Sequence, residues 1–234
     1  MRHDFVVMEG TDGAGKSEQQ RLFAARLRRE RHIPVAEVSF PDYQTPIGRI
    51  IRQWLDGRAW LGRSEGELKL DGGRAYLQEQ ALTLQALMLV NRHERMGEIM
   101  DRLSGGAVVA ARYIGSAFAY GGSDGLDLAW LSQIHEWTIP PTVQFLLKVP
   151  VMEAARRRAL RKGQPADHYE KQGLESMQRI SDRYDALFAP LSADARCWDR
   201  TKRRQITGAL ITIDGVGSVE AVHERIWDAY KRLS

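Results

Sequence analysis

The sequence of 234 residues contains a single cysteine, Cys197, so it cannot form an intramolecular disulfide framework. A chain of this kind is typical of a reducing compartment. No apolar run reaches the roughly 18 residues that a membrane helix needs, and the first four residues lack the pattern of a secretory signal peptide. Internal repeats and low-complexity tracts are also missing. We therefore expect a cytoplasmic protein that does not enter a membrane.

The composition is that of a folded globular protein, with 43% hydrophobic and 27% charged residues. The 6 Trp, 6 Phe and 7 Tyr require a core in which to be buried, which excludes disorder as the main state. The length suits one domain over residues 1–234. A formal net charge of +4 is a mild excess, so the local clustering of charge carries more information than the total.

Basic residues gather in two short segments, at 156–162 and at 196–204. Such clusters attract phosphate, on a nucleotide or on a nucleic-acid backbone. The second segment is expected to be an exposed loop. No stripe of alternating basic and aromatic residues accompanies it, so nucleic acid is not an expected partner.

Short apolar runs typical of buried strands alternate with helical patterns, which predicts a parallel sheet with crossover helices. The expected strands cover residues 5–8, 35–40, 107–111, 143–149 and 206–213. The expected helices cover residues 16–31, 80–103 with a break near Asn91, 151–162, 174–187 and 219–233. The glycine-rich stretches 56–73 and 163–173 are expected to be surface or binding loops.

Residues 10–17, Gly-Thr-Asp-Gly-Ala-Gly-Lys-Ser, match the pattern GxxxxGK(S/T) between an expected strand and an expected helix. The glycines of such a loop let backbone N–H groups turn around a phosphate chain, and the helix N-terminus adds partial positive charge. The lysine reaches the β and γ phosphates, and the hydroxyl holds Mg²⁺. The sequence thus predicts a nucleoside triphosphate site at Gly10, Gly13, Ala14, Gly15, Lys16 and Ser17. Motors, switches, synthetases and kinases share this loop, so the reaction must be read from other residues.

Five segments, in the same order, resemble motifs of the thymidylate kinases, a family of P-loop nucleoside monophosphate kinases. Residues 5–17 resemble the family's EGxDGxGKS opening, and residues 39–48 resemble its FPxRxTxxG segment. Asn91 and Arg92 resemble its (A/S)(N/D)R motif, and residues 112–122 resemble DRYxxSxxAYQG from the second position onward. Residues 167–170, after an Arg-rich helix, are similar to the family's lid. The resemblance runs from about residue 5 to residue 184.

The resemblance implies a doubly wound five-stranded parallel sheet flanked by helices, with a mobile lid at about 156–173. It implies ATP- and Mg²⁺-dependent phosphorylation of a deoxynucleoside monophosphate, foremost dTMP to dTDP, by a homodimer packed through helices. The apolar stretch 82–90 suits such packing, and it suits the core equally well. The residues expected to bind the acceptor are Asp12, Phe40, Pro41, Tyr43, Met88, Arg92, Arg112, Ser116 and Tyr120.

Phosphoryl transfer needs the acceptor held in line with the donor and cations around the transferring group. Arg92 and Arg112 are expected to clamp the acceptor phosphate, because a guanidinium fork matches phosphate oxygens; an ion pair between helices is the alternative for each. The resemblance implies that Asp12 faces the 3′-hydroxyl of the acceptor sugar.

Some thymidylate kinases carry an arginine at the position of Gly13, whereas others have glycine there and supply arginines from the lid. This chain resembles the second kind. The residues expected to act in catalysis are Lys16, Arg112, Arg157, Arg158 and Arg161. A solvated helix face is the alternative for the last three.

Ala111 stands where the family has the aspartate of DRY, a carboxylate that would normally help to hold Mg²⁺ or its waters. Glu9 and Asp12 are the carboxylates nearest in sequence, so the expected metal ligands are Ser17 and Glu9. The loss of this aspartate leaves open the alternative that the chain is a catalytically impaired homologue that still binds nucleotides.

Further departures concern the acceptor. Tyr43 replaces the arginine of FPxR, Met88 replaces an aromatic residue that stacks on thymine, and Gly121 replaces the glutamine of AYQG. These replacements leave open a kinase for a different or modified deoxynucleotide. A third alternative, an ATPase that depends on nucleic acid, disagrees with the order of the motifs.

Overall fold

The computed structural model describes residues 4–56, 74–160, 169, 172–189 and 207–233, and the side chains of residues 74–78 are not among those described. The predicted strand 206–213 and the second basic segment, 196–204, lie partly or wholly outside these residues. The loop predicted over 56–73 and most of the predicted lid also lie outside them.

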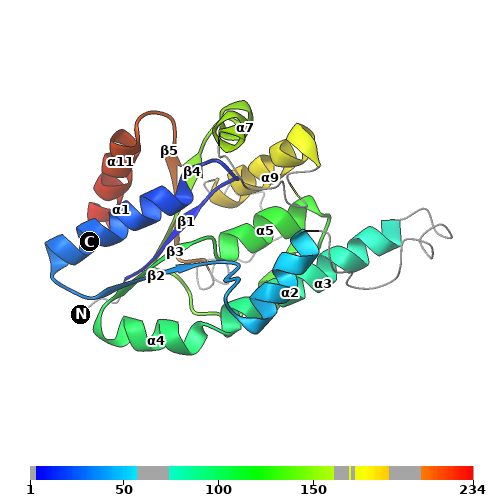
Figure 1. Cartoon of the computed structure of the whole chain (residues 1–234), viewed down its shortest axis with the longest axis horizontal. Helices are drawn as coiled ribbons and strands as arrows, with labels where there is room; N and C mark the ends of the chain where they lie inside the picture. Colours follow the sequence, from blue (N-terminus) through cyan, green and yellow to red (C-terminus); the bar gives the residue numbers. More distant parts are fainter. Residues whose placement is uncertain (1–3, 57–73, 161–168, 170–171, 190–206, 234) are drawn as a thin grey trace.

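The five strands form one parallel sheet in the order β2-β3-β1-β4-β5 (Figure 1). The predicted fold class is therefore confirmed. The strands are β1 (Phe5–Glu9), β2 (Val35–Ser39), β3 (Ala107–Ala111), β4 (Val143–Lys148) and β5 (Ala209–Asp214). Four of them lie within two residues of the predicted bounds, and β5 begins three residues later than predicted.

Helices cover both faces of the sheet, and their bounds only partly follow the prediction. They are α1 (Lys16–Arg31), α2 (Pro46–Leu55), α3 (Arg74–His93), α4 (Met96–Gly105), α5 (Ile114–Ser123), α6 (Leu128–Ile134), α7 (Val151–Ala159), α9 (Gly173–Phe188) and α11 (Val219–Lys231). The break predicted near Asn91 separates α3 from α4 a few residues later. The sequence did not predict α2, α5 and α6. The first of these carries Pro46 and Gly48, and α5 contains three glycines, so neither has the composition of a strong helix.

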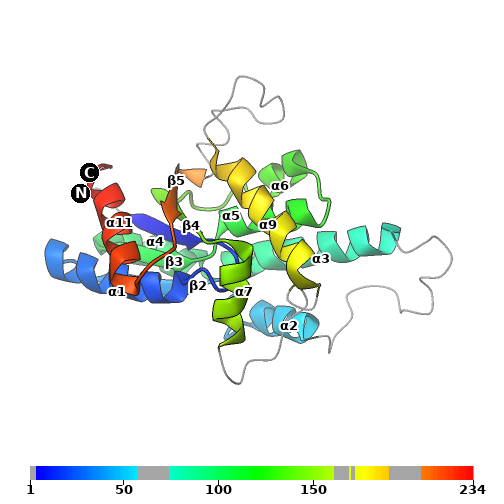
Figure 2. The ribbon, with the colours of Figure 1, turned by 90° about the horizontal axis from the view of Figure 1, so that it is seen from above.

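Alternating residues of the strands point to opposite faces, as the pleat requires. Val6 and Met8 of β1 pack against α1 and α11, whereas Phe5 and Val7 pack against α4, α5 and α6. Helices α1 and α11 lie on one face of the sheet and α4 lies on the other (Figure 1). Helix α9 lies over α5 on the same side as α4 (Figure 2). Among the described residues, no helix combines the length and apolar character that crossing a bilayer demands.

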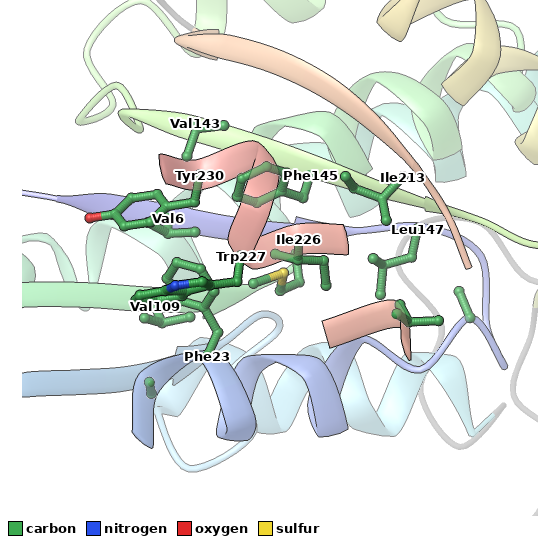
Figure 3. Close-up of a cluster of buried hydrophobic side chains, with 14 of the residues drawn as sticks. Val6, Phe23, Val109, Val143, Phe145, Leu147, Ile213, Ile226, Trp227 and Tyr230 are labelled. Atoms are coloured by element: carbon green, nitrogen blue, oxygen red, sulfur yellow. The ribbon is translucent and has the colours of Figure 1, made fainter. Parts of the chain in front are cut away.

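The core between α1, α11 and the sheet is built from aromatic side chains (Figure 3). The rings of Phe23 and Trp227 have centroids 5.3 Å apart, and those of Phe23 and Tyr230 are 5.1 Å apart in an edge-to-face arrangement. The guanidinium of Arg26 covers the indole at 4.5 Å. This cluster fixes the helix that begins at the phosphate loop.

We predict that Trp227→Ala lowers the free energy of unfolding by about 3–5 kcal/mol, because it removes a large side chain that is 3% exposed. Denaturant unfolding followed by circular dichroism measures the change. Trp137 is 80% exposed, so Trp137→Ala is the matched control and should cost no more than about 0.5 kcal/mol. Equal losses in the two variants would contradict the assignment of Trp227 to the core.

Candidate active site

A cavity of about 310 Å³ opens at the carboxyl ends of β1 and β3. Ligands of open α/β sheets bind at this edge of the sheet. The cavity brings together residues that are far apart in the sequence, from the phosphate loop, the segment after β2, α3 and α5. Of the predicted site residues, those that line it are Asp12, Gly15, Lys16, Ser17, Phe40, Pro41, Tyr43, Met88, Arg92, Arg112, Ser116 and Tyr120.

The phosphate loop joins β1 to the N-terminus of α1, as the sequence predicts. Gly13 and Gly15 have φ angles of +90° and +95°, which L side chains rarely adopt. A Cβ at Gly13 would also lie 2.1 Å from the carbonyl oxygen of Ala154 in α7. This close packing explains why the loop itself has no room for an arginine at position 13.

The two cations nearest the loop are held by the carboxylate of Asp12. Arg112 Nη2 lies 2.5 Å from Asp12 Oδ1, and Lys16 Nζ lies 3.9 Å from the same oxygen. Tyr120 donates a hydrogen bond of 3.2 Å to Asp12 Oδ2. Burial raises the pKa of Asp12, but the charges of Arg112 and Lys16 outweigh it and hold that pKa well below its usual range. Asp12 thus occupies an anion position between two cations.

Arg112 follows directly after β3 with a φ of +62°, a left-handed conformation that is costly for a residue with a side chain. The turn directs its guanidinium back toward the phosphate loop, where Nη1 lies 3.4 Å from the carbonyl oxygen of Gly10. Arg112 Cζ also lies over the ring of Tyr120, 5.0 Å from its centroid, and this cation–π contact supports the same orientation.

Glu9 does not line the cavity, which corrects its prediction as a metal ligand. Its side chain is fully buried, and Oε1 accepts hydrogen bonds from the backbone N–H groups of Tyr113 and Ser116. The other oxygen, Oε2, accepts from the hydroxyls of Ser116 and Tyr184. With both oxygens satisfied by the N-terminus of α5 and by α9, this carboxylate has a structural role.

On the opposite wall, α3 presents Gln85, Met88 and Arg92, at a spacing that places them on one helical face. Arg92 is 3% exposed and donates to the carbonyl oxygen of Tyr113 at 2.8 Å. Burial lowers the pKa of this guanidinium to about 10, so it remains charged at neutral pH. No carboxylate forms a salt bridge with it among the described residues.

His135 at the end of α6 holds the other side of Arg92. Its Nδ1 donates to the carbonyl oxygen of Leu131 at 2.7 Å, which leaves Nε2 as the acceptor for Arg92 Nη1 at 3.2 Å. Burial and the neighbouring guanidinium lower the pKa of His135 to about 3. A neutral imidazole therefore orients Arg92 without cancelling its charge.

Asn91, the residue before Arg92, attaches the loop after β2 to α3. Its side chain accepts from the backbone N–H of Asp42 at 2.8 Å and donates to Thr45 Oγ1 at 2.8 Å. This loop carries Phe40, Pro41 and Tyr43 to the cavity. In the predicted Asn-Arg pair, Asn91 thus anchors the loop after β2, whereas Arg92 lines the cavity.

The lid arginines are not equivalent in position. Arg157 bonds Glu153 at 2.8 Å and the carbonyl oxygen of Gly215 at 3.1 Å, away from the cavity. Arg158 instead lines a small recess beside Thr11 and Asp12. Arg161 lies outside the described residues. The structure therefore brings Arg158 to the phosphate loop and leaves Arg157 on the helix face.

Tyr169 and Gln85 are among the lining residues that were not predicted as site residues. Tyr169 packs its ring against Tyr120, with centroids 4.8 Å apart, and donates to Asp124 at 2.7 Å. Gln85 reaches the cavity from α3 with an exposed fraction of only 2%. The helical spacing of Gln85 to Met88 and Arg92 is a signal that could have identified it.

The residues present fit a nucleotide-bound Mg²⁺ ion. The Ser17 hydroxyl and the Asp12 carboxylate, whose side chain is 30% exposed, both face the cavity. The described residues contain no cluster of three or more His, Cys, Asp or Glu that would form an all-protein metal site. Mg²⁺ in phosphoryl-transfer sites takes few protein ligands besides phosphates and water, so a sparse donor set is sufficient.

Comparison with known proteins agrees with this geometry. The thymidylate kinase family model matches residues 8–70 and 73–226. A probable thymidylate kinase of Thermococcus kodakarensis is 33% identical over 160 residues, which cover 68% of this chain and 72% of the relative. One of Pyrococcus abyssi is 30% identical over 228 residues, covering 97% and 95% of the two chains.

The solved thymidylate kinase of Candida albicans has the same fold, with a TM-score of 0.72 at 19% identity, covering 99% of this chain and 92% of that one. Since the family model extends over most of the sequence and its motifs converge on one cavity, this chain belongs to the thymidylate kinase family.

Proposed function

We propose that the protein transfers the γ-phosphoryl group of ATP to the phosphate of dTMP, with dTDP and ADP as products. The observation that carries this proposal is the convergence of the phosphate loop, Arg112 and Arg92 on one cavity. A donor triphosphate fits the loop, and an acceptor phosphate fits between the two guanidinium groups.

An oxygen of the acceptor phosphate attacks the γ phosphorus while the bond from that phosphorus to the β–γ bridging oxygen breaks, so no side-chain nucleophile is needed. Lys16 neutralises charge on the transferring group, and Arg112 fixes the acceptor once Asp12 releases it. Arg158 is the lid arginine that we assign to the transferring phosphoryl group, since it lies beside Thr11 and Asp12. Mg²⁺, held through Ser17 and Asp12, supplies charge neutralisation on the phosphates when bound.

We also propose a homodimer that packs through α3. Leu82 and Val90 are 37% and 44% exposed, and Ala86 between them is exposed as well. A spacing of four residues places the three on one face of the helix. An apolar stripe of this kind on a helix surface is typical of a protein–protein contact.

The first prediction concerns the acceptor. With ATP and Mg²⁺, we expect ADP formation to be fastest with dTMP when dTMP, dUMP, dCMP, dGMP and dAMP are offered singly. Lys16→Met should lower kcat by about 100-fold or more, because it removes a cation from the transferring phosphoryl group. A coupled ADP assay measures both effects. Faster turnover of another monophosphate would show that the protein is a nucleoside monophosphate kinase whose preferred acceptor is not dTMP.

The second prediction concerns Ala111, which is 4% exposed and lines the cavity at the end of β3. Ala111→Asp should lower the Mg²⁺ concentration for half-maximal rate by about 10-fold, because a second carboxylate orders the waters of the ion. If the wild type only binds nucleotides, the same variant should gain turnover. Ala111→Asn is the uncharged control, and an identical Mg²⁺ dependence in all three proteins would show that no metal carboxylate is missing.

The third prediction concerns the dimer. Val90→Glu should convert the dimer into a monomer in sedimentation velocity, because it places a charge within the proposed apolar contact. Met152 on α7 is 67% exposed and lies outside the stripe, so Met152→Glu should leave the dimer intact. A monomeric wild type would reject the proposed dimer.

A further inference from the structure

Asp124, the residue that follows α5, contacts the wall of the cavity from outside. Its Oδ2 accepts a hydrogen bond of 2.7 Å from the hydroxyl of Tyr169. Its backbone N–H donates to the carbonyl oxygen of Tyr120 at 3.0 Å. Both tyrosines line the cavity, whereas Asp124 does not. One half-buried carboxylate is thus bonded to a residue of the wall without being open to a ligand there.

The ring of Tyr169 borders both the cavity and the recess that contains Arg158. Tyr169 is 6% exposed, and Asp12 and Tyr120 also line both spaces. Tyr169 packs edge-to-face on Tyr120, which in turn donates to Asp12. A displacement of Tyr169 therefore changes the packing of Tyr120 and the placement of the hydroxyl that bonds Asp12.

The hydrogen bond from Tyr169 stabilises the charged form of Asp124. Burial raises the pKa of Asp124 to about 6, although the hydroxyl of Tyr169 and the charge of Arg179 on α9 act in the opposite direction. Arg179 forms its salt bridge with Glu175, at 3.1 Å, and not with Asp124. Tyr169 is thus a direct partner that favours the carboxylate over the protonated carboxyl group.

Two other charged side chains come from the elements next to Asp124. Arg183 of α9 passes Gly122, where its Cδ would lie 3.5 Å from an added Cβ. Asp127, before α6, accepts from the backbone N–H of Trp130 at 2.8 Å. Within the part of the chain that the structure describes, neither of them forms a hydrogen bond or a salt bridge with Asp124.

We propose that Asp124 is a positioning residue for the acceptor and that its protonation weakens acceptor binding. This inference rests on the proposed function, because it assumes that the monophosphate occupies the cavity. As a carboxylate, Asp124 holds Tyr169 in the wall through a charge-assisted hydrogen bond. When it is protonated, its carbonyl oxygen accepts more weakly and Tyr169 is held less firmly. Affinity for dTMP is therefore highest above the pKa of Asp124 and falls as the pH drops through it.

The test measures the Kd of dTMP by calorimetry between about pH 5 and about pH 8, for the wild type and for Asp124→Asn. The variant keeps an oxygen that can accept from Tyr169 but carries no charge, so it mimics the protonated wild type. We expect Asp124→Asn to bind about 5-fold more weakly than the wild type at the upper pH and equally at the lower pH. A phosphate monoester also titrates at about pH 6, and the ratio of the two Kd values cancels that contribution.

Two further variants separate this contact from a general loss of structure. Asp127→Asn makes the same change three residues later, at a carboxylate that does not contact a lining residue, so its Kd should equal that of the wild type at every pH. In a Tyr169→Phe background, Asp124→Asn should have no further effect on the Kd, because the hydroxyl through which it acts is absent. Tyr169→Phe should also raise the pKa of Asp124 in a carboxyl ¹³C NMR titration of the nucleotide-free protein.

A ratio of Kd values that does not change with pH would overturn the inference. So would an effect of Asp124→Asn that persists beside Tyr169→Phe, or a pKa of Asp124 that Tyr169→Phe leaves unchanged. Turnover by the wild type tests the proposed function separately. If the wild type binds dTMP without turnover, the function fails while the ratio of Kd values still decides the role of Asp124. If it binds no dTMP, both fail.

Discussion

The buried carboxylate of Glu9 is the contact on which the geometry of the site depends. It ends β1 directly before the phosphate loop, and it accepts four hydrogen bonds from α5 and α9. A buried charge is stable only with such compensation, and the free N–H groups of a helix N-terminus provide it. Gly115 permits the approach, because a Cβ there would lie 2.9 Å from Glu9 Oε1. The start of α5 is thereby fixed relative to the loop that holds the donor.

Fixing α5 also determines where the acceptor side begins. Arg112 lies between the last residue of β3 and the helix, and its left-handed backbone conformation is maintained by the two elements that it joins. The opposite wall is fixed independently, with Asn91 securing the loop after β2 and His135 orienting Arg92. The cavity thus lies between two rigid walls, each anchored by hydrogen bonds to groups outside it.

Much of this arrangement could be predicted from the sequence. A strand, a glycine-rich loop and a helix occur in continuous order, so local patterns were sufficient to locate the phosphate site. The start of α5 could not be predicted in that way, because a glycine-rich segment becomes helical through its contact with Glu9. Glu9 was assigned to the metal by its nearness in sequence, whereas the direction of its side chain depends on α5 and α9. Gln85 was not predicted, although its helical spacing to Met88 and Arg92 places it on the same face of α3.

The position of Asp12 has a consequence for which anions can bind in the cavity. Its carboxylate offsets one of the two positive charges of Arg112 and Lys16, and it holds Arg112 in an ion pair that an incoming anion must replace. Binding is then an exchange of one anion for another, and a competitor must offer more charge than a carboxylate does. A phosphate dianion meets this condition and a singly charged metabolite does not. Asp12 therefore favours a phosphate dianion over a monocarboxylate as the partner of Arg112.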